Sequence, residues 1–100
     1  MKVVWTEHSL QTLQEIEDYI ARDSPQSAAR FIERLIERGS KLSSFPRAGR
    51  PVPELASPSI REVFEGNYRI VYRVREKDIQ ILAIFDGHRL LAQDDAPPIQ

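Results

Sequence analysis

Arginine alternates with other residues over positions 68–75 of this chain, which read Tyr-Arg-Ile-Val-Tyr-Arg-Val-Arg. In a β-strand, side chains at every second position point to the same face, so Arg69, Arg73 and Arg75 share a face with Val71. A guanidinium makes planar, paired hydrogen bonds with carboxylate or phosphate groups. This face is therefore a candidate binding surface for either group.

Two further arginines lie near this strand in the expected fold. Arg61 belongs to the preceding strand, and Arg89 follows the next strand. The sequence thus predicts a basic groove formed by Arg61, Arg69, Arg73 and Arg89. The alternative is a solvated strand face whose arginines pair across strands with Glu62, Glu65 or Glu76. Alternation alone favours the solvated face, because half-exposed strands usually carry polar outer faces.

The candidate proton-transfer residues are Glu54 and His88. Glu54 lies in a proline-rich segment, where a stiff backbone could hold its carboxylate as a general base. His88 stands between Gly87 and Arg89 at the end of a strand, and an imidazole titrates near neutral pH. Each also has a simpler interpretation as a solvated loop residue, which the sequence alone favours. The other histidine, His8, is too distant for ligand spacing, so we expect no metal and no cofactor.

The composition is that of one small globular domain. The chain has 100 residues, 41% hydrophobic and 29% charged, and it has no cysteine, which excludes disulfides and thiolate chemistry. No apolar run approaches the roughly 20 residues that span a bilayer, so we expect a cytoplasmic protein without a membrane partner. The net charge of −1 is a poor match for extensive phosphate contacts. We expect one domain over residues 1–93 and a loose tail over 94–100.

The first half of the chain predicts a short strand and two helices. Residues 2–5 are β-branched and aromatic, and Thr6 is the expected N-cap of a helix that ends near residue 22. Ser24 and Pro25 begin a second helix that ends near residue 42, and the short link predicts an antiparallel hairpin. The expected apolar stripes are Leu10, Leu13, Ile16 and Ile20, then Ala28, Phe31, Ile32, Leu35, Ile36, Gly39 and Leu42.

The second half predicts three strands in an antiparallel meander. Residues 45–59 hold four of the seven prolines and read as a long loop without a regular element. Strands are expected over residues 60–64, 68–75 and 79–85. The last of them is apolar on both faces and should lie inside the sheet. Tyr68 and Tyr72 share the phase of Ile70, which predicts core positions. The fold class is α+β, in the order β-α-α-β-β-β, with the helical hairpin packed on one face of a twisted antiparallel sheet.

Four stretches carry a family resemblance. They are Phe-Pro-Arg-x-Gly-Arg at 45–50, Pro-Glu-Leu at 53–55, Ile-Arg-Glu at 60–62 and, most specific, Gly-Asn-Tyr-Arg-Ile-Val-Tyr-Arg-Val at 66–74. With the opening strand and helix, they make residues 3–91 resemble the RelE/ParE superfamily of toxins from bacterial type II toxin–antitoxin systems, closer to the ParE-like members. The resemblance implies the fold given above and a small toxin that a cognate antitoxin keeps inactive.

The superfamily contains two mechanisms. ParE-like members bind and poison DNA gyrase without a catalytic residue, and the near-neutral charge favours this branch. RelE- and YoeB-like members are ribosome-dependent mRNA interferases that need no metal. For that activity Glu54 falls near the loop base, Arg69 matches the phosphate-binding arginine, and His88 could approximate the terminal acid. The C-terminal tyrosine of YoeB-like members and the lysine-rich loop of RelE have no counterpart here. An inactive relative that retains only antitoxin binding is a third alternative.

The resemblance also implies an antitoxin segment that folds as it binds, across the helical hairpin or along a sheet edge. The candidate contact residues on the hairpin are Leu13, Ile20, Phe31 and Leu35. The arginines of the sheet would attract acidic side chains of the antitoxin. We accordingly expect Arg61→Ala and Arg69→Ala to reduce toxicity without unfolding the domain.

Overall fold

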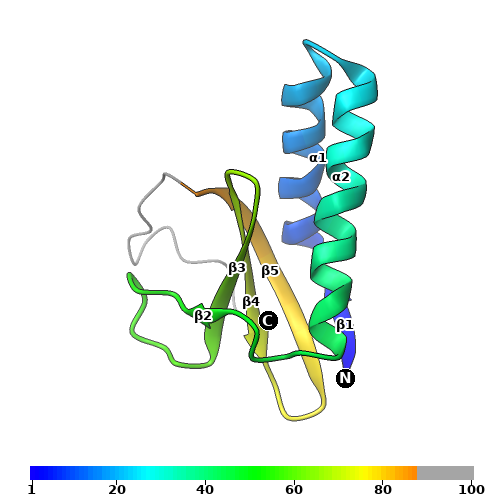
Figure 1. Cartoon of the computed structure of the whole chain (residues 1–100). Helices are drawn as coiled ribbons and strands as arrows, with labels where there is room; N and C mark the ends of the chain where they lie inside the picture. Colours follow the sequence, from blue (N-terminus) through cyan, green and yellow to red (C-terminus); the bar gives the residue numbers. More distant parts are fainter. Residues whose placement is uncertain (88–100) are drawn as a thin grey trace.

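The computed structural model describes residues 1–87, which form a helical hairpin and a five-stranded sheet (Figure 1). The elements are β1 (Lys2–Trp5), α1 (Glu7–Ala21), α2 (Pro25–Ser40), the 3-10 helix η1 (Lys41–Ser43), β2 (Arg50–Pro51), β3 (Ile60–Glu65), β4 (Tyr68–Val74) and β5 (Asp78–Asp86). The sheet order is β1-β5-β4-β3-β2. The helices cover one face of the sheet, and the α1–α2 turn extends beyond it (Figure 1). The predicted α+β class and element order are confirmed.

The sheet is mixed, which corrects the expectation of a purely antiparallel one. β3, β4 and β5 form the predicted antiparallel meander, and β5 lies inside the sheet as expected. β1, however, pairs with β5 in the parallel direction, with Lys2 opposite Asp78. Because two helices separate β1 from the meander, the chain returns to the sheet in an orientation that the strand pattern alone does not specify. The proline-rich segment also contributes the two-residue strand β2, so the expectation of no regular element there is wrong.

Both helices begin as predicted, with side-chain caps. The Thr6 hydroxyl accepts a hydrogen bond from the Ser9 amide, and the Ser24 hydroxyl accepts one from the Ser27 amide. The apolar stripes are partly wrong, since Leu10 is 51% exposed and Ile36 is 43% exposed. α1 instead buries Ser9 and Thr12 beside Ile16. Small hydroxyl residues let the helix lie close to the sheet. Thr12 bonds to the sheet backbone, whereas Ser9 Oγ donates to the Thr6 carbonyl at the start of α1.

A β-bulge explains why hydroxyl residues face the sheet. The pairing of β4 with β5 skips Leu82, because Val71 lies opposite Ala83 while Tyr72 lies opposite Ile81. A bulge leaves backbone groups without their usual partners. The Thr6 amide donates to the Ile81 carbonyl at 3.1 Å, and the Ile84 amide donates to Thr12 Oγ1 at 3.0 Å. The start of α1 thus satisfies the backbone of β5 at its irregular point.

Each face of the sheet has its own apolar cluster. On the face covered by the helices, here called the helix face, the cluster is Ile16, Leu35, Leu42, Val63, Ile70, Tyr72, Ile79, Ile81 and Ile84. The opposite face, here called the loop face, carries Val52, Ile60, Val71 and Leu82, with Leu55 and Phe85 packed against them. The core positions predicted for Ile70 and Tyr72 are confirmed. The loop face is therefore partly covered by the proline-rich segment rather than open to solvent.

Several expectations concern residues that the structure does not describe. His88, Arg89, the tail over 94–100 and the domain limit at residue 93 lie outside the described residues. Over residues 1–87, no helix combines the length and the apolar character that crossing a membrane requires.

Candidate functional site

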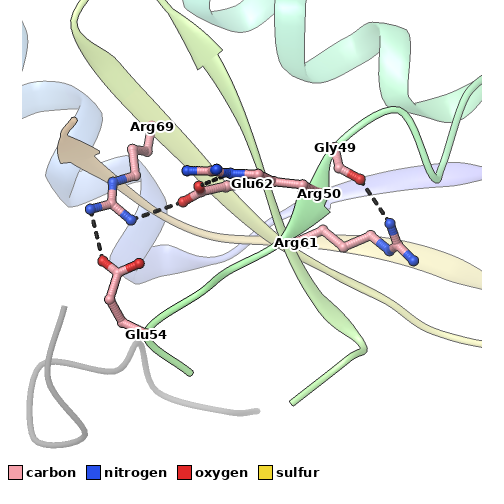
Figure 2. A network of polar contacts seen from close by, with 6 residues as sticks. All are labelled: Gly49, Arg50, Glu54, Arg61, Glu62 and Arg69. Carbon is pink, nitrogen blue, oxygen red and sulfur yellow. Dashed lines mark hydrogen bonds and ion pairs between the residues drawn. The ribbon is translucent and has the colours of Figure 1, made fainter. Parts of the chain in front are cut away.

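Four charged side chains form a continuous chain on the loop face (Figure 2). Arg50 Nε donates to Glu62 Oε2 at 2.8 Å, and Arg69 Nη1 donates to Glu62 Oε1 at 2.9 Å. Arg69 Nη2 lies 2.8 Å from Glu54 Oε2. The charges alternate along this chain and cancel in sum. We call Arg50, Glu62, Arg69 and Glu54 the charge network.

Strand register brings two members of the charge network together. Phe64 lies opposite Arg69, and Glu62 lies opposite Val71, so Glu62 and Arg69 share the loop face. Glu54 arrives from the proline-rich segment, which is held to β3 where the Val52 amide donates to the Ile60 carbonyl at 3.1 Å. Each side chain thus comes from a fixed stretch of backbone.

Burial decides the chemistry of the charge network. Arg69 is only 4% exposed, and the Glu62 side chain is completely buried. The hydrogen bond to Glu54 raises the pKa of Arg69, burial opposes that rise, and Glu62 adds to it. A buried charge that has lost its partners is strongly unfavourable. Both terminal nitrogens of Arg69 contact carboxylates, so an incoming phosphate would have to enter beside two negative charges.

A second set of contacts lies on the helix face and fixes the loop before β2. Tyr72 Oη donates to the Pro46 carbonyl at 2.9 Å and accepts from the Gly49 amide at 2.9 Å. Arg61 Nη1 donates to the Gly49 carbonyl at 2.8 Å (Figure 2). A Cβ on residue 49 would press against the backbone carbonyl of Glu62, so this approach requires glycine. We call Tyr72, Arg61 and Gly49 the loop clamp.

Comparison with known proteins agrees with this architecture. A family model described as the ParE toxin of the type II toxin–antitoxin system parDE matches residues 3–91. The chain belongs to the ParE toxin family. It is therefore a type II toxin–antitoxin toxin of the RelE/ParE superfamily, as the resemblance implied.

Individual relatives of this ParE-family toxin carry both superfamily names. Toxin RelE2 of Caulobacter vibrioides is 37% identical over 90 residues, which cover 89% of this chain and 98% of the relative. The chromosomal ParDE system of P. aeruginosa contains a chain with TM-score 0.73 and 26% identity, covering 86% of this chain and 95% of that one. A chain of the toxin–antitoxin complex RelBE2 of Mycobacterium tuberculosis gives TM-score 0.62 at 20% identity, covering 85% and 95%, a likeness of fold.

The structure of this ParE-family toxin separates the arginines that the sequence grouped. Arg61 lies opposite Tyr72 and so belongs to the helix face, whereas Arg69 and Arg73 belong to the loop face. The predicted groove shared by Arg61 and Arg69 is therefore not formed, because the register places Arg61 opposite Tyr72 and Arg69 opposite Phe64, which puts the two arginines on opposite faces. The alternative interpretation, a solvated face with cross-strand ion pairs, is right about the pairing of Arg69 with Glu62. It is wrong about solvation, because Arg69 is buried. Arg89 and His88 lie outside the described residues.

The residues predicted to contact the antitoxin are core or near-core positions. Leu35, on α2, is completely buried in the helix-face cluster. It is therefore unavailable to a partner, which corrects that expectation. Leu13, Ile20 and Phe31 are half-buried and pack against the helix-face cluster. Their exposed portions keep a role in antitoxin binding as a prediction.

Sequence reasoning missed the loop clamp. The phase of Tyr72 predicts a core position, and nothing in that phase indicates that its hydroxyl reaches a loop 23 residues earlier. The only available signal was the glycine at 49 between two arginines in an otherwise proline-rich stretch. Glycine in such a setting often marks a close backbone approach.

Proposed function

We propose that this toxin arrests growth by binding and poisoning DNA gyrase, the ParE-like mechanism. The observation that carries the proposal is the pairing of Arg69 with Glu54 at 2.8 Å inside the charge network. An mRNA interferase would need Arg69 to hold a phosphate and Glu54 to accept a proton. Here each neutralises the other, and Arg69 is buried.

The energetic argument supports the same proposal. Removing one partner of a buried ion pair typically costs about 3–5 kcal/mol, because the other charge stays desolvated. A substrate phosphate at Arg69 would have to replace the contacts with Glu54 or Glu62 and so would gain less than it would at a free arginine. A protein-binding inhibitor has no such requirement, because the charge network can remain intact while other surfaces make contact.

Ribosome-dependent mRNA cleavage is the second candidate. One observation favours it: folding brings Glu54 and Arg69, which are distant in sequence, within contact distance on one face. Candidate bases and phosphate ligands must be neighbours of this kind. On this view the pair would open when RNA arrives.

We further propose a cognate antitoxin as the partner that neutralises the toxin. The solved relatives are described as a ParDE toxin–antitoxin system and a RelBE2 toxin–antitoxin complex. A cavity of about 540 Å³ on the flank of α2 is lined by Ile20, Ser27, Arg30, Phe31 and Arg34. Its apolar and basic lining suits an amphipathic segment with acidic side chains.

The deciding experiment induces the toxin without antitoxin and follows two readouts within minutes. We expect gyrase-linked DNA breaks, trapped by denaturant, together with transcripts whose 5′ ends are unchanged. New transcript ends at ribosomal A-site codons, without DNA breaks, would establish the interferase instead. Unimpaired growth with normal toxin abundance would identify an inactive relative that retains antitoxin binding.

A matched variant sharpens this test. Glu54→Gln keeps the size of the side chain but removes its charge, so an interferase using Glu54 as base should lose cleavage by 100-fold or more. A gyrase poison should lose only some stability, because Glu54 then has a structural role and no catalytic one. Glu15→Gln, which changes an exposed carboxylate on α1, is the control for surface charge.

A further inference from the structure

A cavity of about 740 Å³ is lined by the loop before β2 and by the end of β4. These segments lie at the end of the molecule opposite the α1–α2 turn (Figure 1). Phe45, Pro46 and Ala48 line the cavity from the loop before β2, and Val74 lines it from the end of β4. Arg47 belongs to the same lining. We call this cavity and its lining the end groove. It is separate from the charge network, which lies on the loop face.

Phe45 is exposed in a way that the fold does not require. Its side chain is 65% accessible, the largest exposure among the large hydrophobic residues described. The backbone around it is nevertheless fixed, because Tyr72 Oη bonds to Pro46 and Gly49, and Arg61 bonds to Gly49. An aromatic side chain held open on a rigid backbone resembles the preorganised anchors of protein interfaces.

The charged side chains that line the end groove are Arg47, Arg75 and Glu76, so arginines outnumber carboxylates there. Three arginines, Arg38, Arg47 and Arg61, act on the Tyr72 hydroxyl and partly oppose the rise in its pKa that burial causes. Arg47 has no ion-pair partner within the described part of the chain, whereas Arg75 is paired with Asp78 at 2.6 Å. An apolar floor beside an unpaired cation complements an apolar side chain that is flanked by carboxylates.

We propose that the end groove is the surface through which this toxin docks on its target protein, gripping an acidic segment with an apolar anchor residue. The inference rests on the proposed function, and so the target is DNA gyrase. The apolar floor favours an apolar side chain of a protein over a phosphate backbone. The cavity proposed for the antitoxin lies on the flank of α2 near the other end of the hairpin, so the two partners need not compete for the same residues.

The test compares two groove variants with a matched control. Phe45→Ala removes the anchor surface, and Arg47→Glu reverses the rim charge. Tyr19→Ala is the control, because Tyr19 is an aromatic residue of nearly equal exposure, 63%, near the α1–α2 turn. All three residues are exposed, so thermal unfolding should be close to that of the wild type. The readouts are purified gyrase–DNA cleavage complexes as a function of toxin concentration, and antitoxin affinity.

We expect Phe45→Ala and Arg47→Glu to need at least about tenfold more toxin for the same cleavage, while Tyr19→Ala matches the wild type. Antitoxin affinity of the two groove variants should stay within about threefold of the wild type. Ala48→Glu, which obstructs the groove without removing a contact, should behave like Phe45→Ala.

Each contrary result has a distinct meaning. If the wild type traps gyrase and the groove variants trap it equally well, the end groove is not the docking surface. If the groove variants lose antitoxin affinity but trap gyrase normally, the groove belongs to the antitoxin. A change only in sedimentation would make it a contact between copies of this chain. If the wild type itself traps no gyrase, the proposed function fails, and the partner assigned to the groove fails with it.

Discussion

The completely buried carboxylate of Glu62 accepts a hydrogen bond from Arg69 at 2.9 Å. This contact ties β3 to β4 through side chains as well as backbone, and Arg69 extends it to Glu54. The residue that a nuclease would use on phosphate is therefore part of the internal support of the loop face. Replacing Arg69 should therefore lower the stability of the fold, whether or not Arg69 also takes part in a reaction.

Replacing Arg69 should unfold the protein more readily. Arg69→Met leaves Glu62 buried beside Arg50 alone and should lower the free energy of unfolding by about 3–5 kcal/mol, measured by urea titration. The expectation that Arg69→Ala spares the fold is thereby revised. The double variant Arg69→Met with Glu62→Leu should recover much of the loss, because no buried charge is left unpaired. An Arg69→Met variant as stable as the wild type would contradict the structural role of the charge network.

Removing one hydroxyl should loosen the loop clamp. Tyr72→Phe leaves the buried Gly49 amide without its acceptor and should cost about 1–3 kcal/mol. Hydrogen exchange at the Gly49 amide should accelerate more than exchange in β5, because the loop opens locally. Equal acceleration throughout the sheet would mean that the hydroxyl supports the whole domain rather than the loop.

Two glycines should respond differently to the same substitution. Gly49→Ala puts a methyl group against the backbone of Glu62 and 2.7 Å from Tyr72 Oη, and should destabilise the protein by roughly 1–3 kcal/mol. A Cβ on residue 39 would lie 2.7 Å from the Trp5 ring and 2.9 Å from Ile81, side chains that must shift to admit it. The gain of about 1 kcal/mol in helix propensity offsets part of that cost. The melting temperature of Gly49→Ala should therefore be lower than that of Gly39→Ala. The reverse order would refute the close approach of Gly49 to the backbone of Glu62.

The ion pair in the β4–β5 turn should give a defined pH dependence. Two hydrogen bonds from Arg75, at 2.6 and 2.7 Å, lower the pKa of Asp78 below its usual value. The ion pair contributes its full stability above the pKa of Asp78 in the unfolded chain, which is near 4. This contribution is lost as the pH falls through the lower pKa of Asp78 in the folded protein. Asp78→Asn should therefore destabilise the protein at pH 7 but not once Asp78 is protonated. Glu76→Gln is the control, and an equal effect of both substitutions at pH 7 would argue against a specific pair.

Much of the fold follows from local signals in the sequence. Thr6, Ser24 and Pro25 fix the helix starts, and the period of two fixes the meander and the core phase of Tyr72. The parallel pairing of β1 does not follow, because it depends on how the hairpin crosses the sheet. The bulge at Leu82 does not follow either. In the sequence, Ser9 and Thr12 of α1 resemble ordinary surface residues, although both are buried against the sheet.

The candidate site was less accessible to sequence reasoning. Alternation along β4 correctly put Arg69 opposite the helix face, but it carried no information about the proline-rich segment that covers that face. The same argument missed that Arg61 lies on the other face, since the register across the β3–β4 turn depends on the length of the turn. Residue patterns describe faces of single strands, whereas ion pairs and clamps arise from the way separate segments meet.

The parallel pairing of β1 with β5 has a consequence for the order of synthesis. Thr6 bonds to Ile81, 75 residues later, so the first strand made must wait for the last strand described before its edge of the sheet can close. Such distant pairing delays folding relative to local contacts. A nascent chain that still lacks β5 has neither a closed sheet nor the loop-face cluster that includes Leu82. The sheet of this toxin can therefore close only after β5 has been synthesised, so a shorter nascent chain lacks the fold of the toxin.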